Sequence, residues 1–167
     1  MMAMRLASLL KSAPLALFLA FSSHAATADA ADVVKQAPHF ASETLTITGK
    51  TGTVHTFTVE VAVSGPQREY GLMFRRQMAA DHGMLFDFDK AQHVQMWMEN
   101  TVLPLDMLFV DTAGGVTHIV ENAVPYSQTI IDSGGPVKYV IELNGGIVKK
   151  LGLAIGDKVS SPTIAKR

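Results

Sequence analysis

The residues best suited to bind a ligand gather around the only tryptophan of the chain. In an extended segment Trp97 and Glu99 share one face, and Asn100 and Thr101 follow directly. Asp106 lies on the next extended segment and points away from its apolar neighbours. An aromatic floor with convergent polar groups is what a small polar ligand, such as a sugar or a carboxylate, requires. This region is therefore the leading candidate for a binding site.

Arg75, from the preceding loop, could join this site. The predicted ligand-binding residues are Arg75, Trp97, Asn100, Asp106 and Glu121. A purely structural interpretation stays open. In it Asn100 and Thr101 form a turn, Arg75 pairs with Asp106, and Trp97 belongs to the core.

A pair of carboxylates would support acid–base hydrolysis instead of simple binding. Asp106, with Glu121 or Glu142, could supply such a pair. Nothing in their spacing sets two of them at a catalytic separation, so hydrolysis is the alternative and binding the leading hypothesis.

The segment Asp132-Ser133-Gly134-Gly135-Pro136 looks like the nucleophile segment of trypsin-like serine proteases. Such a serine needs a histidine base and an oxyanion site. No histidine stands in the alanine-rich context that those proteases use, and the chain is too short for their two barrels. We interpret the segment as a glycine turn in which Asp132 and Ser133 bond to their own backbone.

Copper is a second candidate ligand, because methionine and histidine bind it in cysteine-free proteins. His93, Met96 and Met98 lie close together in the sequence. Side chains alternate along a strand, so His93 faces one way and the two methionines face the other. The histidine and the two methionines of this strand therefore cannot bind the same ion. We predict no metal site and no cofactor.

The elements that must position these residues are mostly strands. Leu45 and Ile47, and then the residues from 55 to 63, alternate between apolar and polar around a glycine turn, which predicts a hairpin. Further strands are predicted over residues 84–88, 93–99, 105–110, 116–121 and 137–143. One short helix is predicted with Pro66 in its first turn, Ser64 or Gly65 as its cap and Gly71 at its end, and a second over residues 145–151. The predicted fold is mainly β, a compact antiparallel β-barrel or sandwich with two short helices.

Composition limits the classes of partner. The chain has no cysteine, 14 basic and 15 acidic residues, and a net charge of −1. No run of like charge occurs, which argues against nucleic acid and against a charged membrane surface as partners. The absence of cysteine also excludes thiol catalysis and disulfides, so the core must be sufficient alone.

The amino-terminal segment has the pattern of a secretory signal peptide. Two basic residues precede the apolar run from Ala13 to Phe21, and small residues follow it. The run is shorter than the roughly 20 residues that span a bilayer. We predict a signal peptide over 1–25, a flexible linker over 26–42 and one β-rich domain over 43–163. The mature protein would be periplasmic or secreted, with no stable membrane insertion.

Several short motifs follow one another from Val59 to Val159. They are Tyr70-Gly71-Leu72-Met73-Phe74-Arg75, Gly83-Met84-Leu85-Phe86, Trp97-Met98-Glu99-Asn100-Thr101, Pro104-Leu105-Asp106, Glu121-Asn122-Ala123 with Pro125, Ser133-Gly134-Gly135-Pro136 and Glu142-Leu143-Asn144. Together these motifs resemble the bacterial and archaeal family called domain of unknown function 192. They occur in one order over about 100 residues, which makes the resemblance specific. The resemblance implies a compact β-rich fold and no particular activity.

These observations favour a non-enzymatic binding or accessory module that recognises a small polar ligand or an envelope protein. The alternatives are a small hydrolase acting on an envelope polymer through the carboxylate pair, and a purely structural partner-binding domain.

We predict that the signal peptide is cleaved after Ala25 or Ala28 on export. Small residues stand one and three places before each of these two peptide bonds. Mass spectrometry of the mature chain should show a new amino terminus at one of these positions. An intact Met1 on protein recovered from the cell envelope would contradict the prediction.

Overall fold

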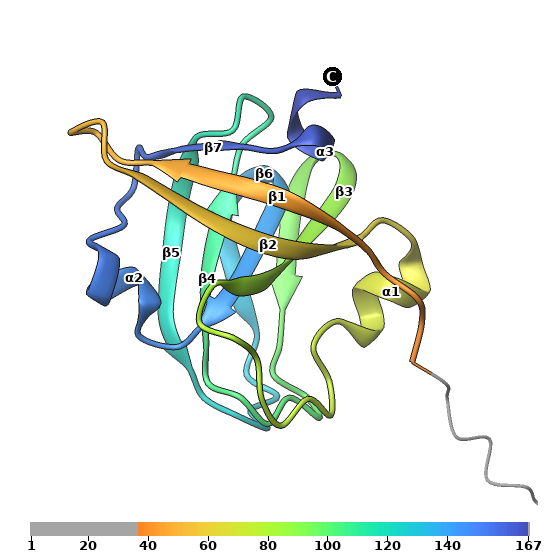
Figure 1. Cartoon of the computed structure of the whole chain (residues 1–167). Helices are drawn as coiled ribbons and strands as arrows, with labels where there is room; N and C mark the ends of the chain where they lie inside the picture. Colours follow the sequence, from red (N-terminus) through yellow and green to blue (C-terminus); the bar gives the residue numbers. More distant parts are fainter. Residues whose placement is uncertain (1–36, 167) are drawn as a thin grey trace, which may run out of the picture. The chain divides into compact units, whose positions relative to one another are not determined.

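Seven strands form one curled sheet, a half-barrel, in the structure of the protein (Figure 1). The structure is a computed structural model that describes residues 37–166, so the predicted signal peptide and most of the predicted linker lie outside the described residues. The strand order is β5-β4-β6-β3-β2-β1-β7. The predicted mainly β fold is confirmed. The strands are β1 (Ala41–Thr48), β2 (Val54–Ala62), β3 (His82–Met96), β4 (Leu105–Val110), β5 (Val116–Ala123), β6 (Ile131–Asn144) and β7 (Lys158–Ser160).

Three short helices accompany the sheet where two were predicted: α1 (Gly65–Tyr70), α2 (Ile147–Leu151) and α3 (Pro162–Ala165). The additional helix, α3, is a single turn. It begins after Ser161, whose side chain accepts a hydrogen bond from the Ile164 amide, and Pro162 opens the turn. Within residues 37–166, no helix has the length and apolar character needed to cross a membrane.

The predicted hairpin is β1–β2. Leu45 pairs with Phe57 across the two strands, and Ile47 and Val59 lie buried on the same face as these two. The alternation of apolar and polar residues therefore places one face of the hairpin in the core, as expected for a strand with period two.

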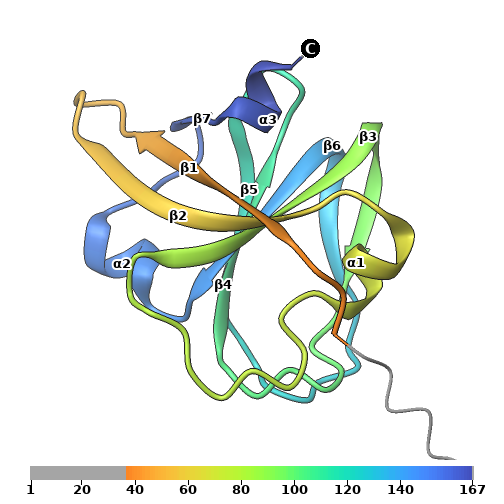
Figure 2. The same ribbon diagram turned by 45° about the vertical axis from the view of Figure 1, so that its right-hand side comes forward.

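One pair of strands is parallel, which the prediction of an antiparallel sheet did not include. β2 and β3 run side by side from Thr58–His82 to Ala62–Phe86. A parallel pair needs a crossover connection, and here α1 and the chain after it supply one. Figure 2 shows α1 beside β3, on this route between the two strands.

The predicted strand 84–88 and the first part of the predicted strand 93–99 belong to one long strand, β3, which ends at Met96 and pairs with β6. The register shifts between the pairs Asp87–Tyr139 and Gln92–Val137. Asp89, between them, has a positive φ of 65°. This irregularity interrupts the apolar alternation, which is why the sequence pattern predicted two separate strands.

The two faces of the sheet bury separate apolar clusters. The inner cluster contains residues from β1, β2 and α2 together with Leu85, Leu108 and Ile141. The outer cluster contains Met84 and Met107 with residues of the loops that cover this face. Both faces of β3, β4 and β6 are therefore buried at the centre of the sheet, and every residue of β4 is buried.

The two edges of the sheet meet at one end. The Val116 amide donates to the Asp157 carbonyl, and the Val159 amide donates to the Gly114 carbonyl, at 3.0 and 2.7 Å. Gly114 has a φ of 79°, and a Cβ there would lie 2.4 Å from the Val159 carbonyl oxygen. Glycine is thus required where the edges approach.

Asp106 joins three elements from the inner face. It is fully buried, and its two carboxylate oxygens accept hydrogen bonds from the backbone amides of Asn122 in β5 and Val148 in α2, both at 2.8 Å. The side chain therefore fixes β4 to the end of β5 and to the start of α2.

Asp106→Ala should lower the free energy of unfolding by about 3 kcal/mol, because it leaves two amides without their charged acceptor. Urea denaturation measures the change. Glu121→Ala is the matched control, since Glu121 is an exposed acid on β5, and it should change stability by less than about 0.5 kcal/mol. Equal effects of the two substitutions would show that the buried contacts of Asp106 are not a stabilising link.

Candidate functional site

A pocket of about 230 Å³ lies between α1, β3 and β6. Four aromatic and two methionine side chains are among its 14 lining residues, and Glu142 is the one acid that reaches it from the sheet. An apolar pocket with few polar groups is the usual form of a small-molecule site. The lining residues are Gly65, Arg68, Glu69, Tyr70, Gly71, Leu72, Met73, Phe86, Phe88, Gln95, Met96, Trp97, Thr101 and Glu142.

Local capping signals place α1 over the pocket. The Ser64 hydroxyl accepts from the Gln67 amide, and the Gln67 side chain accepts from the Ser64 amide, which is a capping box. Gly71 ends the helix with a φ of 48°, and a Cβ there would lie 3.2 Å from the Phe86 ring. The helix end therefore packs closely on the aromatic floor.

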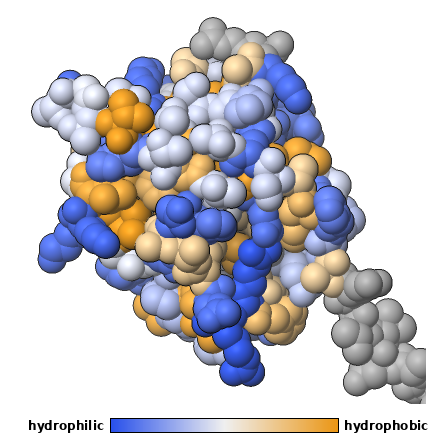
Figure 3. Space-filling view, viewed as in Figure 1, coloured by the Kyte–Doolittle hydropathy of each residue, from blue (hydrophilic) through white to orange (hydrophobic). Residues whose placement is uncertain are grey.

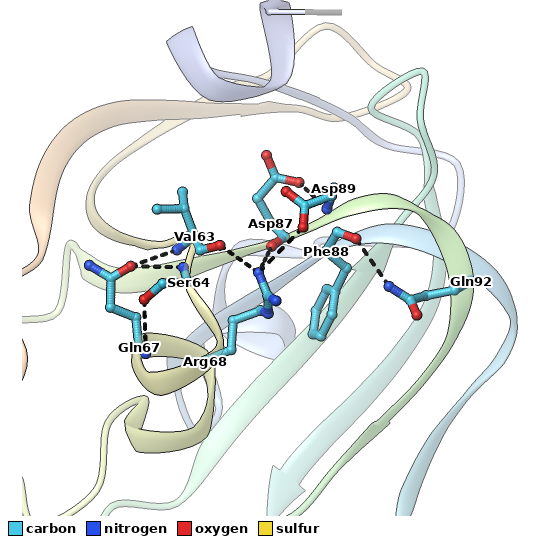
Figure 4. Close-up of polar contacts among 8 residues, drawn as sticks. All are labelled: Val63, Ser64, Gln67, Arg68, Asp87, Phe88, Asp89 and Gln92. Atoms are coloured by element: carbon cyan, nitrogen blue, oxygen red, sulfur yellow. Dashed lines mark hydrogen bonds and ion pairs between the residues drawn. The ribbon is translucent and has the colours of Figure 1, made fainter.

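Arg68 holds α1 against the bend of β3, as Figure 4 shows. Its Nη1 donates to the carbonyls of Val63 and Asp87, at 2.6 and 2.8 Å, and lies 3.9 Å from the Asp89 carboxylate. The guanidinium also lies over the Phe88 ring, 5.4 Å from its centroid. This arginine is thus engaged in positioning the pocket wall.

Glu142 is the chemically unusual residue of the pocket. It lies in β6 between Met84 of β3 and Met107 of β4, and only 4% of its surface is exposed. Among the described residues, none forms a hydrogen bond or an ion pair with its carboxyl group. No fully enclosed side-chain oxygen or nitrogen within residues 37–166 lacks a partner, so the carboxyl oxygens must reach the open space of the pocket.

Burial raises the pKa of Glu142 from its ordinary value of 4.5 to about 8, because desolvation penalises the charged form. The carboxyl group is therefore mainly protonated at neutral pH. In that state it can donate one hydrogen bond and accept others, and in the ionised state it can pair with a cation.

Trp97 is the predicted site residue that lines this pocket. It follows β3 directly and is 39% exposed. The alternation expected along this segment holds: His93, Gln95 and Trp97 are exposed, and the intervening residues are buried.

The other predicted ligand-binding residues lie elsewhere. Both amino groups of the Arg75 guanidinium bind the Glu60 carboxylate, so the expected pairing of Arg75 with Asp106 is wrong. Asn100 is exposed, and its amide nitrogen lies 4.0 Å from the Met73 sulfur.

Asp106, on the inner face, and Glu121, exposed on β5, do not line the pocket either. The strand alternation correctly turned Asp106 away from its apolar neighbours. The face of the sheet toward which Asp106 points is also buried. Asp106 therefore joins elements of the fold and does not contact a ligand.

The structure does not bring together Asp106 and Glu142, one of the carboxylate pairs considered for hydrolysis. Asp106 pairs with Leu143, and Met107 pairs with Glu142, so Asp106 and Glu142 lie on opposite faces of the sheet. Both oxygens of Asp106 are occupied by backbone amides.

The protease-like segment lies inside β6, so the turn predicted there is wrong. It falls where the register of β6 against β3 shifts between the pairs His93–Pro136 and Gln95–Asp132. Ser133 is buried, and its hydroxyl donates to the Gly135 carbonyl at 2.7 Å and accepts from the Val94 amide at 3.0 Å. Asp132 accepts from the Gly134 amide at 2.8 Å. The expected bonds of Asp132 and Ser133 to the nearby backbone are therefore present, and the hydroxyl already has two partners.

The side chains considered for copper point to different sides. His93 is exposed, and Met96 and Met98 are buried in the outer cluster. Within residues 37–166, no group of three histidine, aspartate or glutamate side chains is placed to hold a metal ion.

Comparison with known proteins gives the family of the chain. The model of DUF192, described as "Uncharacterized ACR", matches residues 46–161, which is more than half of the chain. The chain belongs to this family, as the motifs predicted. Among curated proteins, none matches the chain significantly.

Two solved structures are similar to this chain. A protein of Sinorhizobium meliloti 1021, called a "putative transcription regulator", is 54% identical, with a TM-score of 0.73 over 74% of this chain and 96% of that one. A protein of unknown function from Novosphingobium aromaticivorans DSM 12444 is 40% identical, with a TM-score of 0.68 over 70% of this chain and 83% of that one. Both support the fold.

Glu142→Gln should change how stability depends on pH. The folded protein keeps the Glu142 proton up to about pH 8, and the unfolded chain loses it near pH 4.5. The folded state therefore binds more protons between these values, and the stability of the wild type falls as pH rises through this window. At about 1.4 kcal/mol per pKa unit, the loss over the whole window is about 5 kcal/mol.

Urea denaturation at pH 5, 7 and 9 measures this effect. Relative to Glu142→Gln, the wild type should lose stability steadily as pH rises. Glu121→Gln, which makes the same change at an exposed position, should follow the wild type. Parallel curves for the wild type and Glu142→Gln would show that the Glu142 carboxyl titrates normally.

Proposed function

We propose that this protein is a binding module for a small molecule with an apolar body and one polar group, and that the ligand occupies the pocket between α1, β3 and β6. The observation that carries this proposal is the buried carboxyl group of Glu142, which reaches the pocket without a partner among the described residues. The proposal keeps the small ligand expected from the sequence and replaces most of the residues that bind it.

A structural role explains Glu142 poorly. Burying an ionisable group without a partner costs stability, and buried polar groups are normally paired. Asp106, on the neighbouring strand, follows that rule with two amide donors. Glu142 departs from it at a place where a pocket opens, so a ligand group is the natural partner.

Two other kinds of partner have less support. In Figure 3, hydrophobic side chains on the viewed face are interspersed with hydrophilic ones, without one continuous apolar surface of the kind that a stable protein partner would cover. The word "regulator" in the name of the Sinorhizobium meliloti relative applies to that protein. In the part of this chain that the structure describes, the helices have four to six residues, too short to read a DNA groove.

We propose from the sequence alone that the protein acts in the periplasm or outside the cell. The signal-peptide pattern favours these compartments, and the protein would bind its ligand there. An envelope protein that delivers or receives the ligand would be compatible with this role.

A fragment screen on the full chain tests the function. Binding should change the fluorescence of Trp97 and the methyl resonances of Met73 and Met96, because all three line the pocket. Tyr70→Ala removes an aromatic wall and should weaken the binding of any hit by about 1 kcal/mol or more.

Tyr126→Ala is the matched control, since Tyr126 is 62% exposed and lies outside the pocket lining. It should leave affinity unchanged. A screen without hits at the pocket, or hits that weaken equally in both variants, would argue against a binding site here.

A further inference from the structure

We propose that the ligand is a cation, a protonated amine on a compact apolar body, whose ammonium group pairs with the carboxyl group of Glu142. This inference rests on the proposed binding function and deepens it by naming the class of ligand. It follows from three features of the pocket: its aromatic walls, its single deep acid and the engagement of its one arginine.

Four aromatic side chains line the same pocket as the acid. Tyr70 comes from α1, Phe86 and Phe88 from β3, and Trp97 from the residue after β3. Aromatic faces attract cations, and more strongly where water is excluded. A neutral ligand would gain only burial from these walls, whereas a cation gains burial and the attraction to the rings.

The other charged groups of the lining come from α1. Arg68 donates to two backbone carbonyls and lies beside Asp89, so its charge is directed to the bend of β3 and is partly balanced there. Glu69, an exposed acid, adds a negative charge to the lining. Tyr70 is the other titratable group, and the lining residues from β3 and from residues 97 and 101 carry no charge.

The ionisation of Glu142 favours the same class of ligand. Its pKa of about 8 lies close enough to neutrality for a bound cation to draw the proton off. At pH 7 about one site in ten is already ionised, so the requirement for ionisation weakens binding only about tenfold. Between pH 6 and pH 8 the ionised fraction, and with it the affinity for an amine that stays protonated, should rise roughly 50-fold.

The size of the pocket limits the apolar body. An engineered cavity of about 150 Å³ holds benzene, and this pocket is about 230 Å³. Cyclohexylmethylammonium is a six-membered ring with one methylene and a charged head, which suits the space. Cyclohexylmethanol has nearly the same shape and no charge, so the two compounds separate the effect of charge from that of size.

Titration of the full chain with each compound at pH 7.5, followed by Trp97 fluorescence and calorimetry, tests the inference. The ammonium compound should bind at least tenfold more tightly than the alcohol. Glu142→Gln should abolish this preference, and Glu121→Gln, at an exposed acid outside the pocket, should keep it. In the wild type the preference should grow from pH 6 to pH 8, a measurement that needs no variant to fold.

In one outcome the wild type binds the alcohol as tightly as the ammonium compound or more tightly, and in another its preference for the ammonium compound does not depend on pH. Either result would contradict the proposal that the ligand is a cation and would leave the binding function intact. The same holds if neither compound binds but the fragment screen finds neutral molecules in the pocket. If the screen also finds nothing there, the binding function itself fails.

Discussion

The pairing of β6 with β3 on one side and with β4 on the other is the constraint on which the rest of the structure depends. Separate apolar clusters cover the two faces of these three strands. Water therefore reaches neither face at the centre of the sheet, and a polar side chain there must find a partner in the protein or border a cavity. Two acids occupy this region, and each meets the requirement in a different way: Asp106 with two backbone amides, Glu142 at a pocket.

Local signals in the sequence predicted the local parts of the fold. The alternation around the first glycine turn predicted β1–β2, and Pro66 and Gly71 predicted where α1 starts and ends, because caps and turns depend on neighbouring residues. The parallel pairing of β2 with β3 and the continuity of β3 through its bend depend on distant segments. No pattern of neighbouring residues carries that information.

The candidate site was predicted only in part, because it too depends on contacts between distant segments. Strand alternation correctly predicted that Trp97 faces away from Met96 and Met98 and that Asp106 points away from its apolar neighbours. It could not say that both faces of β4 are buried, and so it placed Asp106 in a ligand site. Glu142 had a readable signal, since it is a single acid inside the apolar run from Val140 to Leu143. Such an acid is expected at a buried site, but its pocket is closed by α1, more than 70 residues earlier.

The position of the pocket follows from the crossover. A parallel β2–β3 pair requires the chain to leave the sheet, and α1 lies on this excursion, over the face that carries Met84 and Glu142. Arg68 and Gly71 then fix the helix to β3 at both ends of the pocket wall. The same connection that makes one pair of strands parallel thus leaves a lined space above a buried acid. The topology and the candidate site have one origin in this fold.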